Sequence, residues 1–562
     1  MDLSDAIELK NSFEAIPLDE PFKLYAGPGA GKTTFLVNHI KRILNHSDKL
    51  KRSRKIACIT YTNAAVNTLR NRLDGSLESI EITTIHSFCY KHIVKPFIWL
   101  LDSSLIAIDK LDGHDEIKLR KSQIAKIKSE TRQNYLSDTN LAKALNKLQW
   151  ILEKDKTFKL GFIRHFDSRV DGYTIKPTTF SKYKEIYWAE GKLSHDDVLY
   201  FAYNILLQEP YICEIIRGKF PYLLIDEFQD TSPLQVAIVE LIAEKETTLG
   251  VIGDVCQSIY SFQGASVQDF EEFEVPQMKL YILRNNSRSS NEIITVLNHM
   301  RQDKDFEQVS VNNIEGPKPI IIIGSKTKSY DYFKNQSLVD LKILAYRKET
   351  LDTFQNPQAS SANEVEYIVK DSNSERGWRI FYVIKSLEYA KQLKIKESLK
   401  AMRMAYRKES FTEKNSFENL KRLIQFQEQI NNLPLTQIYN EFLYGHYNIK
   451  AKITGGAAKE MYDNILYSQA VLQMKLVDDI NDFQTVHNAK GEEFENVLLI
   501  IPSLERNELS FLLAPNMNKE EHRVYYVALS RAKKGLYINF PNLPEAEKST
   551  LVNIGFDVIS VE

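Results

Sequence analysis

The sequence predicts an α/β protein whose sheets are mostly parallel and which contains two α/β blocks. Three observations support this prediction. Short apolar segments alternate with helical patterns, which favours parallel strands joined by helices. A glycine-rich turn leads from an apolar segment into a helix near the N-terminus, as in phosphate-binding loops. The alternation stops twice, and both interruptions have the pattern of helices and loops.

This pattern divides the chain into four parts. The first α/β block is expected at 1–95 and 186–277, with a helical, basic insertion at 96–185, and the second at 278–350 and 478–562, with a helical, polar insertion at 351–477. The expected strands are 22–26, 55–59, 81–84, 220–225, 249–254, 279–283, 319–323, 341–346, 497–501 and 536–540. In this division the strand at 279–283 opens the second block.

The composition is that of a globular protein of several domains. The chain has 562 residues, 43% of them hydrophobic and 26% charged, and a formal net charge of −1. That length suggests about three to four domains, and the neutral balance means that any nucleic-acid contact must come from local patches. The four cysteines show no metal-ligand spacing, and neither a signal sequence nor a membrane-spanning run is present. We therefore expect a cytoplasmic protein without membrane contact.

The glycine-rich turn predicts a nucleotide triphosphate site. Its glycines allow backbone N–H groups to surround a polyphosphate at the start of a helix. Lys32 is placed to reach the β- and γ-phosphates, and the Thr33 hydroxyl to ligate Mg²⁺. Ala26 holds the place where the strict motif begins with glycine. The expected nucleotide-binding residues here are Ala26, Gly27, Pro28, Gly29, Ala30, Gly31, Lys32, Thr33 and Thr34.

A second strand end predicts hydrolysis. The apolar run 220–225 leads directly into Asp226 and Glu227. Because the carboxyl ends of parallel strands meet at one edge of a sheet, these carboxylates should lie beside the phosphate loop. Asp226 would then hold Mg²⁺, and Glu227 would orient or deprotonate the attacking water.

Two other features have a structural and a functional interpretation. Tyr61 and Phe88 follow the strands at 55–59 and 81–84, where rings serve either ligand binding or core packing. Residues 110–185 carry 17 Lys+Arg against 10 Asp+Glu, a net charge of +7. This segment is a candidate contact for a phosphate backbone, and a solvated helix face is the alternative.

Taken in order, the motifs resemble those of the UvrD/Rep-type superfamily 1 DNA helicases. The resemblance covers nearly the whole chain apart from the two insertions, and it implies two RecA-like domains with ATP between them. The matching motifs are the glycine-rich loop, Thr60-Tyr61-Thr62-Asn63, Thr84-Ile85-His86-Ser87, Asp226-Glu227-Phe228-Gln229-Asp230-Thr231, Gly253-Asp254 with Gln257-Ser258-Ile259-Tyr260, Arg288-Ser289, His487 with Lys490-Gly491, and Tyr526-Val527-Ala528-Leu529-Ser530-Arg531-Ala532.

The resemblance also implies roles for individual residues. Gln257 would sense the γ-phosphate, and Glu493 would contact the ribose. Arg288 and Arg531 would reach the γ-phosphate from the second domain. The alternative for either arginine, taken without the other motifs, is a surface ion pair. With Lys32, Asp226 and Glu227, these residues complete the expected hydrolysis site for ATP and Mg²⁺. The residues expected along single-stranded DNA are Tyr61, Asn63, His86, Tyr260, Phe262 and His487.

Four positions depart from the family pattern. No glutamine precedes Gln123, so the residue that reads adenine is missing and Asn11 lies near its place. Ser287 replaces a tyrosine, Gln263 replaces an arginine, and Glu492 replaces a leucine. Two rings, Tyr25 and Phe35, are alternative partners for the adenine base. Nucleotide choice and unwinding strength are the properties that these changes affect.

The resemblance leaves two functions open. The first is an ATP-dependent translocase or helicase that moves 3′ to 5′ on single-stranded or partly duplex DNA. The second is a DNA-activated ATPase that regulates a separate nuclease subunit, as in anti-phage defence systems of the Gabija kind. The stretch after residue 545 is too short for an appended nuclease domain, and the chain is short for a repair helicase of this type.

Overall fold

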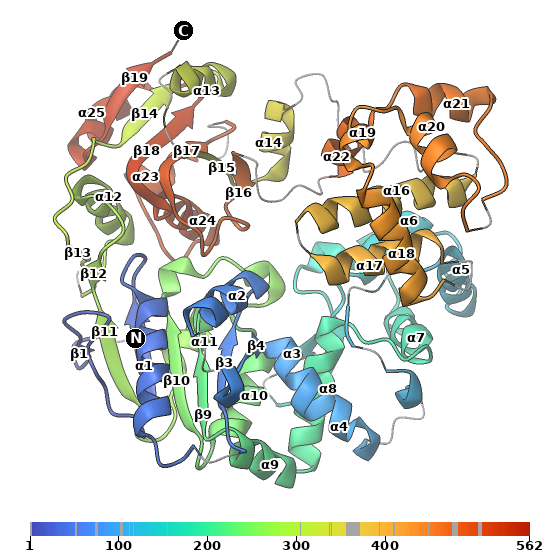
Figure 1. Cartoon of the computed structure of the whole chain (residues 1–562). Coiled ribbons are helices and arrows are strands. Elements are labelled where there is room, and N and C mark those ends of the chain that lie inside the picture. The colour runs from blue at the N-terminus through green and yellow to red at the C-terminus, as the bar shows by residue number, and fades with distance from the viewer. Residues whose placement is uncertain are drawn as a thin grey trace. The chain divides into compact units, whose positions relative to one another are not determined.

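Figure 1 shows the chain as a computed structural model. It describes residues 3–50, 53–73, 77–101, 105–111, 113–115, 117, 119–153, 155–303, 305–335, 338, 340–355, 371, 373–392, 394–407, 411–447, 449–474, 482–503 and 508–561. The chain forms two compact units, one of residues 1–348 with 485–562 and one of residues 349–484. The second unit nearly coincides with the insertion expected at 351–477.

The first unit contains a seven-stranded sheet in which every pairing is parallel. Its strands are blue and green in Figure 1, because they come from the first 84 residues and from residues 222–283. Across the sheet the order is β1 (Ile7–Glu8), β11 (Lys279–Leu283), β2 (Phe22–Ala26), β10 (Thr248–Gly253), β9 (Tyr222–Ile225), β3 (Ile56–Thr60) and β4 (Ile80–Thr84).

One strand lies in a different sheet from the one expected. Strand β11 was assigned to the start of the second block, but it pairs with β2 along its whole length, Lys279 opposite Phe22 and Leu283 opposite Ala26. The first block therefore extends to Leu283 rather than ending at 277. Strand pairing is a contact between distant segments, so an apolar run alone does not say which sheet it joins.

Both faces of this sheet are covered. Along β9, Tyr222 and Leu224 contribute to one hydrophobic core while Leu223 and Ile225 contribute to the other. This alternation of side chains between two buried faces explains why the strand is apolar at every position. The helices of this domain include α1 (Lys32–His46), α2 (Asn63–Arg72), α3 (Ile85–Cys89), α8 (His195–Gln208), α9 (Tyr211–Lys219), α10 (Pro233–Ala243) and α11 (Val267–Glu272).

A six-stranded sheet forms the second α/β domain. The pairings of β15 with β17, β17 with β18, and β14 with β18 and β19 are parallel. The order is β16 (Phe483–Thr485), β15 (Leu341–Ala345), β17 (Phe494–Ile500), β18 (Ala532–Phe540), β14 (Ile320–Ile323) and β19 (Asp557–Ser560), and its helices include α12 (Asn291–Arg301), α13 (Lys326–Asn335), α23 (Ser510–Leu513), α24 (Glu520–Leu529) and α25 (Glu545–Ile554). Two parallel sheets of this kind confirm the expected pair of RecA-like domains.

The basic insertion combines helices with two short hairpins. Its helices are α5 (Lys121–Glu130), α6 (Asp138–Leu145) and α7 (Pro177–Trp188), and its hairpins pair β5 (Gln149–Leu152) with β6 (Phe158–Gly161) and β7 (Arg169–Val170) with β8 (Tyr173–Thr174). Several of its positive charges are neutralised within the protein, which reduces its excess charge toward a ligand. These ion pairs are Lys126–Glu130, Lys128–Asp138, Lys147–Asp167, Lys182–Glu130 and Lys184–Asp197.

The second unit is helical in its described part and has its own hydrophobic core, which includes Leu387, Met402 and Leu420. Helices α16 (Ser374–Lys391) and α17 (Ile395–Ala405) are joined by hydrogen bonds in which Ser386 and Ser398 each donate to the other's carbonyl oxygen. The remaining long helices are α18 (Glu413–Ile424), α21 (Gly456–Asp463) and α22 (Tyr467–Met474). Within the described ranges, no helix of the protein has both the length and the apolar character that crossing a membrane requires.

Strand β10 provides a test of this packing. A Cβ atom at Gly250 would lie 2.4 Å from the Phe22 ring and 2.8 Å from Leu224, both buried. We expect Gly250→Ala to destabilise the first domain by about 1–3 kcal/mol through overpacking. The matched control is Gly218→Ala in α9, where nothing lies within 4 Å and alanine favours the helix. The measurement is the urea midpoint of unfolding. Equal midpoints for the two variants would contradict the packing described.

Candidate functional site

The glycine-rich turn forms a loop between strand β2 and helix α1. Gly29 and Gly31 have φ angles of 71° and 84°, a left-handed conformation that glycine adopts without a steric penalty. A Cβ atom at Gly29 would also lie 2.3 Å from Asn286 Oδ1, so only glycine fits there. The Lys32 ammonium donates to the Ala26 carbonyl oxygen over 3.3 Å, across the loop. The loop therefore has the backbone form and the lysine position that phosphate binding requires.

The two carboxylates at the end of β9 lie in a strained turn. The Asp226 N–H donates to the Ile59 carbonyl oxygen over 2.9 Å, which continues the contact with β3. Glu227 has a φ of 55°, an uncommon conformation for a residue with a side chain. Its carboxylate accepts a hydrogen bond from the Gln229 amide over 2.5 Å. Strain of this kind occurs at functional sites, where the surrounding structure enforces it.

Electrostatics separate the roles of the two carboxylates. Burial works to raise both pKa values. For Glu227 the positive charges of Lys32 and Lys490 outweigh burial and lower its pKa, so it stays ionised. For Asp226 the adjacent Glu227 charge adds to burial and raises its pKa. A cation beside Asp226 would relieve that unfavourable burial, and carboxylate and hydroxyl oxygens are ligands that suit Mg²⁺. The side chains of Asp226 and Thr33 therefore have the chemistry of magnesium ligands.

The second domain contributes two arginines. Arg531 is buried, and its Nη2 donates to Gln257 Oε1 in the first domain over 3.2 Å. Burial, followed by the like charge of Arg288, lowers the pKa of Arg531 to about 9. Arg288 pairs with Glu493 at 2.7 Å, and its Cβ would lie 2.9 Å from a Cβ at Gly29. The structure thus brings Arg288 to the phosphate loop with Glu493 beside it, and it brings Arg531 to Gln257 in the field of Glu227.

Lys490 belongs to the motif that contains His487 and Gly491, but the sequence alone predicts no role for its side chain. Its ammonium donates to the Asp230 carboxylate and, over 2.6 Å, to the Gln257 carbonyl oxygen. Both partners belong to the first domain, so Lys490 is a buried ion-pair partner across the domain contact. A signal for it existed in the sequence. Asp226, Glu227 and Asp230 follow one buried strand, and Lys32 alone cannot neutralise three carboxylates.

Most of the expected DNA-binding rings form one row across the two domains. Tyr61 stacks on Tyr260 with centroids 4.7 Å apart, and Phe262 lies 5.9 Å from Tyr260 and 5.5 Å from His487. The row continues to Tyr346, 5.9 Å from His487 and absent from the sequence prediction. Tyr260 is 8% exposed and Phe262 is 39% exposed. Phe262 is therefore exposed, whereas Tyr61, Tyr346 and His487 are half-buried.

His86 and Asn63 lie outside that row. His86 packs beside His195 and His114, with ring centroids 5.5 Å and 6.4 Å away. Burial, together with these neighbours, lowers the pKa of His86 to about 3, so the imidazole is neutral. Asn63 is the exposed first residue of α2. Among the described residues, no group of three or more His, Cys, Asp or Glu side chains has the arrangement of a metal site.

The structure also shows where the unusual positions lie. Asn11 accepts a hydrogen bond from the Phe13 N–H over 2.9 Å, within its own turn. The Ser287 hydroxyl donates to the Gly29 carbonyl oxygen over 3.1 Å, at the phosphate loop. Gln263 accepts a hydrogen bond from the Tyr61 hydroxyl and so fixes the first ring of the row. Each of these three side chains therefore forms a hydrogen bond within the protein.

Both rings proposed as alternative adenine partners belong to the core. Tyr25 is 2% exposed, and its hydroxyl accepts a hydrogen bond from Arg301. Phe35 is 1% exposed and packs against Phe22 and His39. Neither ring is therefore exposed to stack on a base, and this alternative finds no support. Helix α1 turns Phe35 toward the sheet, and strand β2 turns Tyr25 toward the contact with the second domain.

A phosphate loop, an acidic strand end and arginines from a second sheet define a P-loop NTPase with two RecA-like domains. Residues 9–277 match the UvrD/REP helicase N-terminal domain family, and residues 336–542 match the UvrD-like helicase C-terminal domain family. The chain belongs to the UvrD/Rep-type superfamily 1 helicases and is thus an enzyme of the class of ATP-hydrolysing DNA helicases.

Similar proteins agree with this assignment. A probable DNA helicase II homolog from Mycoplasma capricolum is 24% identical over 89% of this chain and 68% of its own length. One from Mycoplasma genitalium is 23% identical over 92% of this chain and 82% of its own. The ATP-dependent DNA helicase PcrA of Staphylococcus aureus is 27% identical over 57% of this chain and 42% of its own, so the match spans less than half of that protein.

The carboxylate geometry predicts separate effects for two substitutions. We expect Glu227→Gln to keep nucleotide binding and to lower DNA-stimulated ATP hydrolysis by about a hundredfold or more, because a neutral amide cannot accept the proton of water. Lys32→Ala should weaken both nucleotide binding and turnover. The control is Glu545→Gln, an exposed carboxylate on α25. Steady-state hydrolysis and nucleotide titration measure these effects. Wild-type turnover by Glu227→Gln would contradict the role given to Glu227.

Proposed function

We propose that this protein is an ATP-dependent translocase that moves 3′ to 5′ along single-stranded DNA and separates strands as it moves. The observation that carries this proposal is the short segment Gln257–Phe262. At one end Gln257 contacts Arg531, and further along Tyr260 and Phe262 belong to the aromatic row. Lys490 lies 5.0 Å above the Tyr260 ring while it pairs with Asp230. One short segment and the Lys490 side chain therefore link the hydrolysis site to the aromatic row that we propose binds DNA.

The proposed hydrolysis step uses groups from both domains. Lys32 and the loop N–H groups bind the β- and γ-phosphates of ATP. When bound, Mg²⁺ would supply charge neutralisation for these phosphates, with Thr33 and Asp226 as its protein ligands. Glu227 accepts the proton of the attacking water, and its low pKa keeps it ionised for that purpose. Arg288 and Arg531 stabilise the negative charge on the transferring phosphoryl group.

Movement along DNA would follow from closing and opening the contact between the two domains. Bases stack on aromatic rings whatever their sequence, and each stack contributes about 1–3 kcal/mol. The row includes Tyr61, Tyr260 and Phe262 of the first domain and His487 and Tyr346 of the second. A change in the distance between these groups would pass a base from one to the next. The unpaired basic side chains of the first insertion would add salt-dependent contacts to the DNA backbone.

Gln263 favours a second candidate function. It stands where the family has an arginine, and its amide oxygen accepts a hydrogen bond from Tyr61. One cation near the strand is therefore missing, which would weaken the grip on DNA during unwinding. A protein of this kind would serve as a DNA-activated ATPase and regulate a separate nuclease. Strand displacement by the purified chain alone supports the first function, and ATP hydrolysis without displacement supports the second.

Streptavidin displacement tests the polarity and the aromatic row together. A 3′-to-5′ translocase should remove streptavidin from the 5′ end of a biotinylated oligonucleotide far faster than from the 3′ end. Tyr260→Ala combined with Phe262→Ala should weaken DNA binding at high as well as low salt, because stacking is not screened by ions. Tyr211→Ala, an exposed ring on α9, is the matched control. Faster displacement from the 3′ end, or unchanged DNA affinity of the double variant, would contradict the proposal.

The residues that lie where base recognition would be expected predict weak nucleotide selectivity. Asn11 Oδ1 and the Ser287 hydroxyl bond within the protein, and Tyr25 and Phe35 are buried, so these groups are not placed to recognise adenine in this structure. We expect kcat/KM for ATP to exceed that for GTP by no more than about tenfold, or about 1.4 kcal/mol. The assay compares both nucleotides with saturating single-stranded DNA. A preference above about a hundredfold would show that another group provides base recognition.

A further inference from the structure

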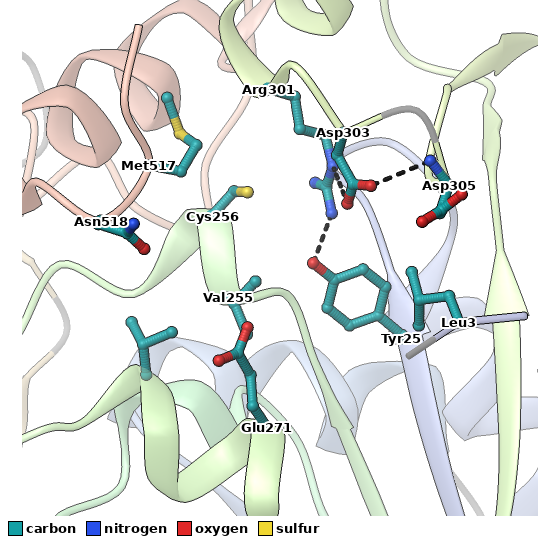
Figure 2. A pocket seen from close by; sticks show the side chains of 11 residues that line it. Leu3, Tyr25, Val255, Cys256, Glu271, Arg301, Asp303, Asp305, Met517 and Asn518 are labelled. Carbon is teal, nitrogen blue, oxygen red and sulfur yellow. Dashed lines mark hydrogen bonds and ion pairs between the residues drawn. The ribbon is translucent and has the colours of Figure 1, made fainter. Parts of the chain in front are cut away.

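Arg301 is a buried cation that bridges the two RecA-like domains. It is the last residue of α12 in the second domain, and its side chain is 1% exposed. In Figure 2 the guanidinium group points at the Tyr25 hydroxyl, and the side chains of Cys256 and Met517 lie nearby. Tyr25 belongs to β2, directly before the phosphate loop. Neither the motifs nor the expected site residues include Arg301.

The contacts of Arg301 reach two motif segments of the first domain. Its Nη2 donates to the Tyr25 hydroxyl over 2.7 Å, and its Nη1 donates to Asp254 Oδ1 over 3.0 Å. The guanidinium group also lies over the Phe306 ring, 3.9 Å from its centroid. An arginine fork held by a ring, a hydroxyl and a carboxylate has a defined orientation. Arg301 therefore fixes Asp254 at the end of β10.

From Asp254 the hydrogen bonds continue to the hydrolysis site. The Gln257 amide nitrogen donates to Asp254 Oδ2 over 2.8 Å. The amide oxygen of the same Gln257 accepts from Arg531 Nη2 over 3.2 Å. One unbroken path thus runs from Arg301 through Asp254 and Gln257 to Arg531. It begins and ends in the second domain and passes through the first.

We propose that Arg301 is a positioning residue for ATP hydrolysis, which holds Asp254 so that Gln257 is oriented toward the reacting phosphate when the two domains meet. This inference rests on the proposed function and on the role that the family resemblance implies for Gln257, which is to sense the γ-phosphate. It adds a residue that contacts neither nucleotide nor DNA. When the domains separate, Asp254 loses its cation, and Gln257 loses the support that keeps its amide in place.

The surroundings of Arg301 suit a contact that forms and breaks. A cavity of about 180 Å³ adjoins it, lined also by Glu271, Asp303 and Met517. Within the described part of the chain, Arg301 Nε has no hydrogen-bond partner. The Asp303 carboxylate lies 3.9 Å from this nitrogen. A buried ion pair of this kind is weak evidence for stability, because apolar side chains of similar volume stabilise as well. Positioning is the role that its hydrogen bonds support.

The first test is Arg301→Lys, which keeps the charge and removes the forked donors. We expect kcat for ATP hydrolysis at saturating single-stranded DNA to fall about tenfold, while KM for ATP stays within about twofold. The matched control is Arg217→Lys. Arg217 is also buried, but among the described residues it donates to the carbonyl oxygens of Ile242 and Leu241 and to Glu244, which all belong to the first domain. This control should lower the melting temperature without lowering kcat.

A double-mutant cycle with Gln257→Ala separates positioning from a general loss of structure. If Arg301 acts through Gln257, Arg301→Lys should change kcat by less than about twofold once Gln257 is replaced. A structural role predicts the same tenfold loss in both backgrounds, and that result would overturn the inference. Unchanged hydrolysis by Gln257→Ala itself would overturn the proposed site along with it. The two failures are therefore distinguishable.

Tyr25→Phe covers the case in which Arg301→Lys does not fold. It removes only the hydroxyl that orients Nη2 and leaves the ring in the core. We expect a loss in kcat of about threefold, again absent in the Gln257→Ala background. The two variants to compare are Arg301→Lys and Tyr25→Phe. If each of them that folds has a kcat within experimental error of the wild type, the inference is overturned.

Discussion

The structure depends on the neutralisation of buried negative charge at the end of strand β9. Three carboxylates follow this strand within five residues, those of Asp226, Glu227 and Asp230. Asp226 and Asp230 are buried, and Glu227 is half-buried. A buried carboxylate without a cation costs several kcal/mol. Lys32 supplies one positive charge from the same domain, and Lys490 supplies another from the second domain. The acidic strand end that hydrolysis requires therefore also takes part in the contact between the two domains.

The same constraint connects the chemistry with the DNA side of the molecule. Lys490 pairs with Asp230 and lies over the Tyr260 ring, so one cation contacts both regions. Arg301 forms a second link of this type on another part of the domain contact, where it pairs with Asp254. Both links join a cation of the second domain to a carboxylate beside a strand end of the first. A change in the domain contact must then alter the nucleotide site and the aromatic row together, which is what coupled movement requires.

Much of the site could be predicted because its motifs are local. A phosphate loop needs only a strand, a glycine-rich turn and a helix in succession, and Asp226 and Glu227 directly follow their strand. Other features depend on segments that meet only in the fold. The run 279–283 is equally apolar in either sheet, and its partner β2 lies more than 250 residues away. The sequence likewise does not show that Tyr25 and Phe35 face the core, because ring type alone is compatible with either role.

By itself the sequence determined the α/β class, the phosphate loop, the acidic pair and the helicase family, since each is written in contiguous residues at short spacing. Only the tertiary structure decided which groups neutralise the buried carboxylates and which rings form the row. Lys490 meets Asp230, Arg301 meets Asp254, and Tyr346 meets His487 across the contact between two domains. Such contacts follow from the packing of the two domains against each other. No spacing within the chain encodes them, because the two partners of each contact are positioned by different sheets.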